Sequence, residues 1–151
     1  MANTQAMCTS FKTELLDAVH NFGVAPTRGT TAADTFYAAL YLTSATLGAG
    51  TTAYTATGEV SGPGYSAGGI AVTNATVPTS SGTTAYWTPS ASLVYTGVTL
   101  TTAFDTVLIY NQTQGNKSVS VHTFGSQTIT AGTFTLTMPA NTNTTALIRL
   151  A

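Results

Sequence analysis

Charged residues are what this sequence most lacks. Only 6% of its 151 residues are Asp, Glu, Lys or Arg, against a usual share of about 25% in soluble domains. The four basic residues, Lys12, Arg28, Lys117 and Arg149, are far apart in the sequence, so they do not form the basic stripe that follows nucleic-acid phosphates. We therefore expect no nucleic-acid partner and no binding to an anionic membrane.

Cysteines and long apolar runs are also scarce. Cys8 is the single cysteine, so no intrachain disulfide can form, and we expect a small buried hydrophobe or, as the alternative, a thiol open to a partner. No run approaches the ~20 apolar residues that span a bilayer. Lys12, Glu14 and Asp17 interrupt the N-terminal stretch, which therefore does not resemble a secretory signal.

The sequence shows no spacing typical of a metal site. Two histidines, one cysteine and five carboxylates lack the close pairs of zinc and calcium ligands, so we expect no metal and no cofactor. His20 follows Asp17 by one helical turn, which predicts a local ion pair. His122 shares a strand face with Ser118 and Ser120, which predicts exposure to solvent or to another subunit.

The stretch GPGYSAGG, residues 62–69, matches two catalytic patterns, a nucleophile elbow around Ser66 and a dinucleotide-binding loop. Both patterns require a following helix, whereas IAVTNATV is typical of a strand. Ser66, Asp105 and His122 occur in hydrolase order, an order that a Ser-rich chain produces by chance. Glu59 and Asp105 have no sequence support as a glycosidase pair. We interpret the stretch as a flexible loop and expect no enzyme.

Threonine is abundant instead, at roughly a fifth of the residues. Such β-branched residues favour pleated sheets over helices. The 43% of hydrophobic residues suffices for the core of one domain spanning residues 1–151, since a domain of this size hides roughly 68–70% of its unfolded surface. A net charge of −1 gives little repulsion between copies, which favours association.

A helix is expected near the N-terminus. Phe11, Leu15, Val19 and Phe22 recur at helical spacing after Ser10, which predicts an amphipathic helix over residues 10–22. Residues 1–9 then form an N-terminal arm, residues 23–35 a linker and residues 36–151 a β body.

Short strands are expected throughout the β body. Gly, Pro, Asn and Ser separate apolar or alternating segments, and QTQGN at residues 112–116 is the best hairpin signal. The expected strands cover residues 35–43, 52–60, 69–77, 83–89, 92–100, 104–111, 117–125, 126–139 and 144–151. We therefore predict an all-β fold, an antiparallel jelly roll or β-sandwich of about eight strands with one N-terminal amphipathic helix.

The aromatic residues of the β body allow two interpretations. An exposed platform of rings would suit glycan or protein binding, whereas packing on sheet faces is the ordinary alternative. The residues concerned are Tyr54, Tyr65, Tyr86, Trp87, Tyr95 and Tyr110.

Several segments together resemble a known class of protein. They are MANTQAMCTSFKTELLDAVHNFG, YLTSATLGAGTTAYTATGEVSGPGYSAGG, TTAYWTPSAS and FDTVLIYNQTQGNKSVSVHTFG. As a set they are similar to short structural proteins in the virion modules of tailed bacteriophages, most like the capsid cement or decoration proteins.

This resemblance implies a non-enzymatic protein made in the host cytoplasm and carried on the outer capsid surface of the virion. It implies a jelly-roll or sandwich body that binds the major capsid protein and stabilises the shell, as a homo-oligomer with a trimer favoured. A neck or tail component and a glycan-binding, adhesin-like module remain as alternatives.

The polar arm before the helix is the candidate for contact with a partner. Ala2, Asn3, Thr4 and Gln5 are expected either to tether a neighbouring protein or to form a frayed terminus.

Overall fold

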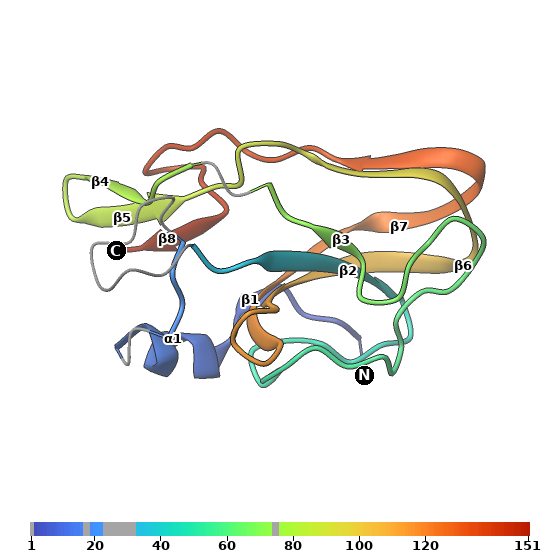
Figure 1. Ribbon diagram of the computed structural model, residues 1–151, viewed down its shortest axis with the longest axis horizontal. Coiled ribbons are helices and arrows are strands. Elements are labelled where there is room, and N and C mark those ends of the chain that lie inside the picture. Colours follow the sequence, from blue (N-terminus) through green and yellow to red (C-terminus); the bar gives the residue numbers. More distant parts are fainter. Residues whose placement is uncertain (1, 17–18, 23–32, 74–75) are drawn as a thin grey trace.

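The chain folds into two antiparallel β-sheets, which confirms the predicted all-β class (Figure 1). The computed structural model describes residues 2–16, 19–22, 33–73 and 76–151. Its elements are β1 (Ala6–Met7), α1 (Thr9–Leu16), β2 (Phe36–Leu42), β3 (Ile70–Ala71), β4 (Thr79–Ser81), β5 (Thr84–Trp87), β6 (Leu93–Asn111), β7 (Lys117–Leu136) and β8 (Ile148–Leu150).

The larger sheet has the order β1-β7-β6-β2-β3, and the smaller has the order β4-β5-β8. Residues of both sheets, such as Leu40 on β2 and Trp87 on β5, belong to one hydrophobic core. Of the two predicted architectures, a sandwich describes this arrangement.

A long hairpin forms the centre of the molecule. Its strands β6 and β7 contain 19 and 20 residues, where the sequence predicted four shorter strands. The predicted turn at residues 112–116 is confirmed, because Asn111 pairs with Lys117 across it. The predicted strand breaks coincide instead with a bend, since the register shifts between Leu100 and Phe104.

At this bend the hairpin folds back over itself (Figure 1). The outer half, residues 93–100 with 129–136, lies over the inner half. Tyr95 of the outer half donates a hydrogen bond to the Ala38 carbonyl of β2 at 2.8 Å, and the Phe134 ring packs on Phe104 with centroids 5.1 Å apart. The contacts of these inward side chains hold the two halves together.

The predicted helix over residues 10–22 is too long. Helix α1 ends at Leu16, and the described residues after it, 19–22, are not helical. Phe22 instead stacks on Phe36 with ring centroids 4.4 Å apart and contacts Trp87 at 4.7 Å. Packing against the β body therefore outweighs the helical pattern, because a short isolated helix is marginally stable in water. Most of the predicted linker lies outside the described residues.

Residues 43–69 form a long loop instead of the strand predicted at residues 52–60. Only isolated bridges link Ala53 to Lys117 and Tyr41 to Glu59. The loop follows the sheet through Leu42 N–H to Gly58 O at 2.9 Å and Val60 N–H to Leu40 O at 3.0 Å. The strands predicted at 69–77 and 144–151 shorten to β3 and β8.

The core lies between the sheet, the outer half of the hairpin and the N-terminal segment. Cys8 is fully buried, which confirms the interpretation as a small hydrophobe, and burial raises the pKa of its thiol. The largest fully buried side chains are Tyr41, Phe11, Phe36, Phe104, Leu40, Leu93, Leu100, Leu108 and Ile109.

Candidate functional site

The N-terminal arm is bound to the protein's own β body. Asn3 Nδ2 donates to Leu42 O and to Asp105 Oδ1, each at 3.1 Å, while Asn3 Oδ1 accepts from Leu47 N–H at 2.8 Å. Thr4 N–H donates to Leu47 O at 2.8 Å. The arm is thus anchored at Asn3, and neither a frayed end nor a free tether describes it.

The other side chains of the arm remain open to a partner. Ala2, Thr4 and Gln5 are exposed, and the Gln5 side chain accepts a hydrogen bond from Thr123 Oγ1 at 3.3 Å. A partner contact through these three residues stays a prediction, but it would use a fixed surface instead of a loose arm.

The GPGYSAGG stretch is a loop, as predicted, but it is firmly held. Gly69 has a φ of 78°, and a Cβ at this position would lie 1.8 Å from Ala38 O. Gly64 likewise has a φ of 78°, and its Cβ would lie 2.2 Å from Gly97 O. Glycine therefore allows the loop to pass between β2 and the outer half of β6 at backbone contact distance, which corrects the expectation of flexibility.

Glu59 ties the same loop together. Its carboxylate accepts hydrogen bonds from Tyr54 Oη at 2.6 Å, Tyr65 Oη at 2.8 Å and Gly68 N–H at 2.7 Å. Tyr65 Oη also accepts from Leu40 N–H at 3.0 Å. Burial, together with the Glu59 charge, raises the pKa of Tyr54 to about 12, so this phenol stays protonated and donates.

The residues in hydrolase order do not form a catalytic triad. Asp105 accepts from Asn3, and His122 Nε2 lies 2.8 Å from Ser120 Oγ. Across the part of the chain that the structure describes, no hydrogen bond joins Ser66, Asp105 and His122. The Ser120–His122 pair is no substitute, because Ser120 is 1% exposed.

The expected exposure of the β7 face around His122 is wrong for its two serines. Ser118 and Ser120 are buried, and Ser118 Oγ donates to Thr51 O at 2.6 Å. His122 itself is partly buried, and burial lowers its pKa to about 4. The imidazole is therefore neutral near physiological pH.

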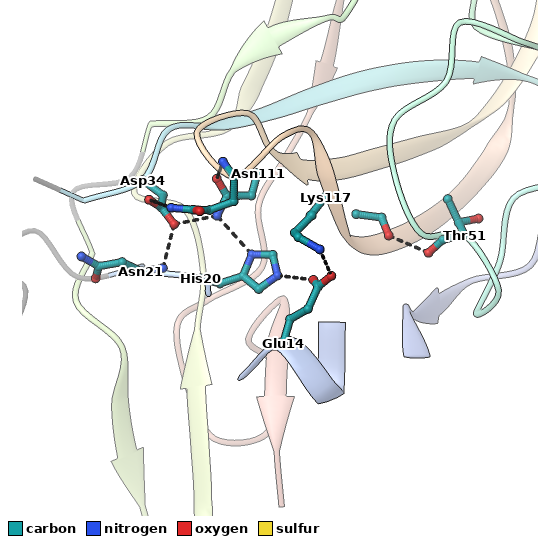
Figure 2. Close-up of polar contacts among 9 residues, drawn as sticks. Glu14, His20, Asn21, Asp34, Thr51, Asn111 and Lys117 are labelled. Atoms are coloured by element: carbon teal, nitrogen blue, oxygen red, sulfur yellow. Dashed lines mark hydrogen bonds and ion pairs between the residues drawn. The ribbon is translucent and has the colours of Figure 1, made fainter. Parts of the chain in front are cut away.

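A buried polar cluster, which the sequence did not predict, connects the N-terminal segment to the turn of the long hairpin (Figure 2). Its members are Glu14, His20, Asn21, Asp34, Asn111, Gln114 and Lys117. The predicted partner of His20, Asp17, lies outside the described residues. His20 instead contacts Glu14 and Asn111.

Hydrogen bonding in this cluster assigns the protonation of His20. Gln114 N–H donates to Asn111 Oδ1 at 3.1 Å, so Asn111 Nδ2 faces Asp34 Oδ2 at 2.7 Å and His20 Nδ1 at 3.1 Å. Since Asn111 Nδ2 is a donor, His20 Nδ1 accepts, and Nε2 carries the proton that is donated to Glu14 Oε2 at 2.7 Å.

Glu14 holds the negative charge of the pair with Lys117. Burial raises the pKa of Glu14, but the hydrogen bonds from Lys117 Nζ, at 2.6 Å, and from His20 lower it by more, so the net pKa lies below its ordinary value. The cluster thus joins α1, which is early in the sequence, to the hairpin, and its described polar contacts are internal. This arrangement contributes to the stability of the fold.

The aromatic residues do not form an exposed platform. Trp87, Tyr95 and Tyr110 are buried, and Trp87 Nε1 donates to Thr76 O at 2.9 Å. Tyr54 and Tyr65 are partly buried and bonded to Glu59. Packing on sheet faces, the ordinary alternative, describes these residues.

Two surface hollows are lined by described residues alone. The first, of about 980 Å³, lies beside the 43–69 loop and is lined mainly by hydroxyl side chains such as Ser44, Thr46, Thr52 and Thr57. The second, of about 430 Å³, is lined by Met7, His122, Leu136, Met138, Leu147 and Arg149, among others. We call the second hollow the edge groove.

The outer half of the long hairpin presents a neutral surface, which runs along the top of the molecule in Figure 1. No Asp, Glu, Lys or Arg occurs in residues 92–104 or 118–148. Exposed hydroxyl side chains dominate this surface, namely Thr96, Thr101, Thr102, Ser126, Thr128, Thr130, Thr133 and Thr135. We call it the threonine face.

The structure and the comparisons with known proteins add no further site. Among the described residues no three His, Cys, Asp or Glu side chains are grouped to hold a metal ion, and no helix there is long and apolar enough to cross a membrane. No protein family, curated protein or solved structure matches this chain. The candidate functional surfaces are therefore the threonine face, the edge groove and the exposed part of the arm.

Proposed function

We propose that this chain is a non-enzymatic virion structural protein of the capsid cement or decoration type, which binds the major capsid protein and stabilises the shell. The observation that carries the proposal is the threonine face, a broad surface with no charged residue beside a long open strand edge. Docking through buried area and strand pairing needs such a surface and no reactive group.

The placement of the charges supports the same function. The described carboxylates bond to groups inside the molecule, as Glu59 does to Tyr54 and Asp105 to Asn3. Lys117 is paired with Glu14. Covering a surface without charges costs less than covering a charged surface, because no ion loses its hydration.

Repeated copies on a shell make modest contacts sufficient. Each additional contact between linked copies raises the effective concentration of the next. A homo-oligomer, with a trimer favoured, on the outer capsid surface would use this effect, and the protein would be made in the host cytoplasm before assembly.

A neck or tail component uses the same kind of surface and is the main rival. An adhesin-like glycan binder is less well supported, because Trp87 is 2% exposed and cannot stack on a sugar. Both rivals are distinguishable by where the protein lies in the particle.

Electron microscopy of purified particles tests the proposal. We expect regular density over the whole shell, and particles without the protein should lose integrity at lower heat or osmotic stress. Density confined to the neck or tail would replace the cement function with the first rival. A positive glycan array together with density at the tail tip would favour the second.

Variants of the threonine face test its part in docking. Thr128→Glu with Thr130→Glu places two charges on the face, and Gln112→Glu is the matched control at the exposed hairpin turn. We expect the double variant to lose at least about tenfold in affinity for shells, while the control binds like wild type. Equal binding by all three proteins would remove the threonine face from the interface.

A further inference from the structure

The edge groove lies where the open edge of β7 passes the last strand. Met7, Leu136, Met138 and Leu147 contribute apolar side chains that also pack on the core. Its volume of about 430 Å³ is within the usual range of pockets that hold ligands. The groove therefore has an apolar floor large enough for one or two side chains of a partner.

The neighbouring edge of β7 is open. Strand β1 pairs only with Ser120 and Val121, and Gln5 shields Thr123 by a hydrogen bond. In the described part of the chain, residues 133–136 form backbone hydrogen bonds with β6 alone. Their pairing is regular from Leu136 with Leu93 to Phe134 with Tyr95, and the nearest register shift begins after Tyr95.

This edge also lacks the usual protection against strand pairing. Proteins commonly guard such edges with Lys, Pro or a bulge. No charged residue occurs between residues 118 and 148, and Pro139 follows the end of the strand. A regular, neutral and uncovered edge is a template for an added strand.

Arg149 supplies the one charge of the groove. Its backbone pairs with Tyr86 of β5, whereas its side chain is exposed, lines the groove and makes no ion pair or hydrogen bond with any described residue. His122, the only other titratable group that lines the groove, is neutral near physiological pH. The groove thus combines an apolar floor with a single free guanidinium, which suits a carboxylate.

The acidic side chains described in a second copy of this chain do not offer that carboxylate. Each of the four acidic side chains there is already bonded within the molecule, as shown for Glu14, Asp34, Glu59 and Asp105. Charge complementarity therefore favours a different protein as the occupant.

We propose that the edge groove receives an extended segment of a partner protein that carries an Asp or Glu residue. The segment adds a strand to β7 at residues 134–136, places an apolar side chain on Leu136 and Met138, and binds Arg149 through its carboxylate. This inference rests on the proposed function and deepens it, because it makes the groove the attachment site for the shell protein.

Peptide selection tests the groove without any particle. A library of random peptides of about eight residues, the length of an ordinary strand, with acetylated and amidated ends is selected on wild-type protein. We expect enrichment of alternating apolar residues with one Asp or Glu. Arg149→Gln should weaken binding of the selected peptides by at least about tenfold, whereas Gln112→Ala should not change it.

Two further measurements make the test specific. Replacing the acidic residue of a selected peptide by Asn should weaken binding to wild type but not further weaken binding to Arg149→Gln. Amide hydrogen exchange at residues 134–136 should slow when the peptide binds. Selection without an acidic preference, equal affinity for Arg149→Gln, or unchanged exchange at these amides would each overturn the proposal.

Shell binding separates this inference from the proposed function. If wild type and Arg149→Gln decorate shells equally, the groove is not the attachment site, although the cement function stands. If acidic peptides bind through Arg149 but the protein binds no part of a particle, the edge groove is still a peptide-binding site. The proposed cement function is then overturned, and the partner is not a shell protein.

Discussion

Replacing Gly69 by alanine tests how closely the GPGYSAGG loop is packed against β2. Gly69 has a φ of 78°, and an added Cβ would lie 1.8 Å from Ala38 O and 2.5 Å from Ala38 C. Both neighbours are backbone atoms of a central strand. The loop must therefore move away from the sheet for the methyl group to fit.

The expected cost has two parts. A left-handed backbone costs a residue with a Cβ roughly 1–2 kcal/mol. Movement of the loop also strains or breaks the bonds of Gly69 N–H to Ser66 O, at 2.9 Å, and of Gly68 N–H to Glu59, at 2.7 Å. A neutral hydrogen bond contributes about 1 kcal/mol and one to a charged group about 1.5–3 kcal/mol, so Gly69→Ala should destabilise the fold by about 3.5–6 kcal/mol if both bonds are lost.

Gly82→Ala is the matched control. Gly82 also has a positive φ, of 59°, but its Cβ would meet no atom within 4 Å. Its cost should be the backbone part alone, about 1–2 kcal/mol. The difference between the two variants, about 2.5–4 kcal/mol, then measures the contact with β2.

Urea unfolding of wild type and both variants, followed by circular dichroism, gives these free energies. We expect a much larger fall in the unfolding midpoint for Gly69→Ala than for Gly82→Ala, with similar slopes. Equal losses for the two variants, or a loss below about 1 kcal/mol for Gly69→Ala, would refute the close approach of the loop to the sheet.

Three further predictions concern the polar contacts. Asn111→Ala removes the hydrogen bonds to Asp34, His20 and Gln114 and should lower the free energy of unfolding in urea by about 3 kcal/mol. Gln112→Ala is the control, and a comparable loss from it would show a general effect of the turn. Burial lowers the His122 pKa from 6.5 to about 4, so the unfolded chain binds more protons than the folded chain between these pH values, and stability falls as pH decreases through this window. Thermal melts of His122→Gln should show a smaller fall in stability over the same window. A pH profile of His122→Gln equal to that of wild type would contradict the assignment. Asn3→Ala should lower the unfolding free energy by about 1–2 kcal/mol through its lost anchor, which Gln5→Ala should not do; equal effects would mean that the arm is not held at Asn3.

Much of the fold class was readable from local sequence patterns. The Thr-rich composition predicted sheets, and the QTQGN segment predicted the turn of the central hairpin. The residues of Phe36–Leu42 are apolar on both faces of an extended chain, which predicted a covered strand. Each of these signals depends on residues within one turn or one strand, where steric preference and turn chemistry act directly. Burial of Cys8 followed in the same way from its hydrophobic character.

The candidate surfaces and the polar cluster depend on contacts between residues far apart in the sequence, which no local sequence pattern predicts. The hydrogen bonds of Asn3 to Asp105, of Lys117 to Glu14 and of Tyr95 to Ala38 form only when the chain folds and brings these distant residues together. The end of the helix at Leu16 was also decided there, because Phe22 gains more from Phe36 than from another helical turn.

The sequence by itself therefore determined the kind of structure, a charge-poor β body with a hairpin turn at residues 112–116. Tertiary structure alone decided that the hairpin folds over, that the rings are covered and that Arg149 is left beside an open edge. The physical reason is that composition and periodicity report the local free energy of each segment, whereas exposure and pairing depend on which distant segments meet.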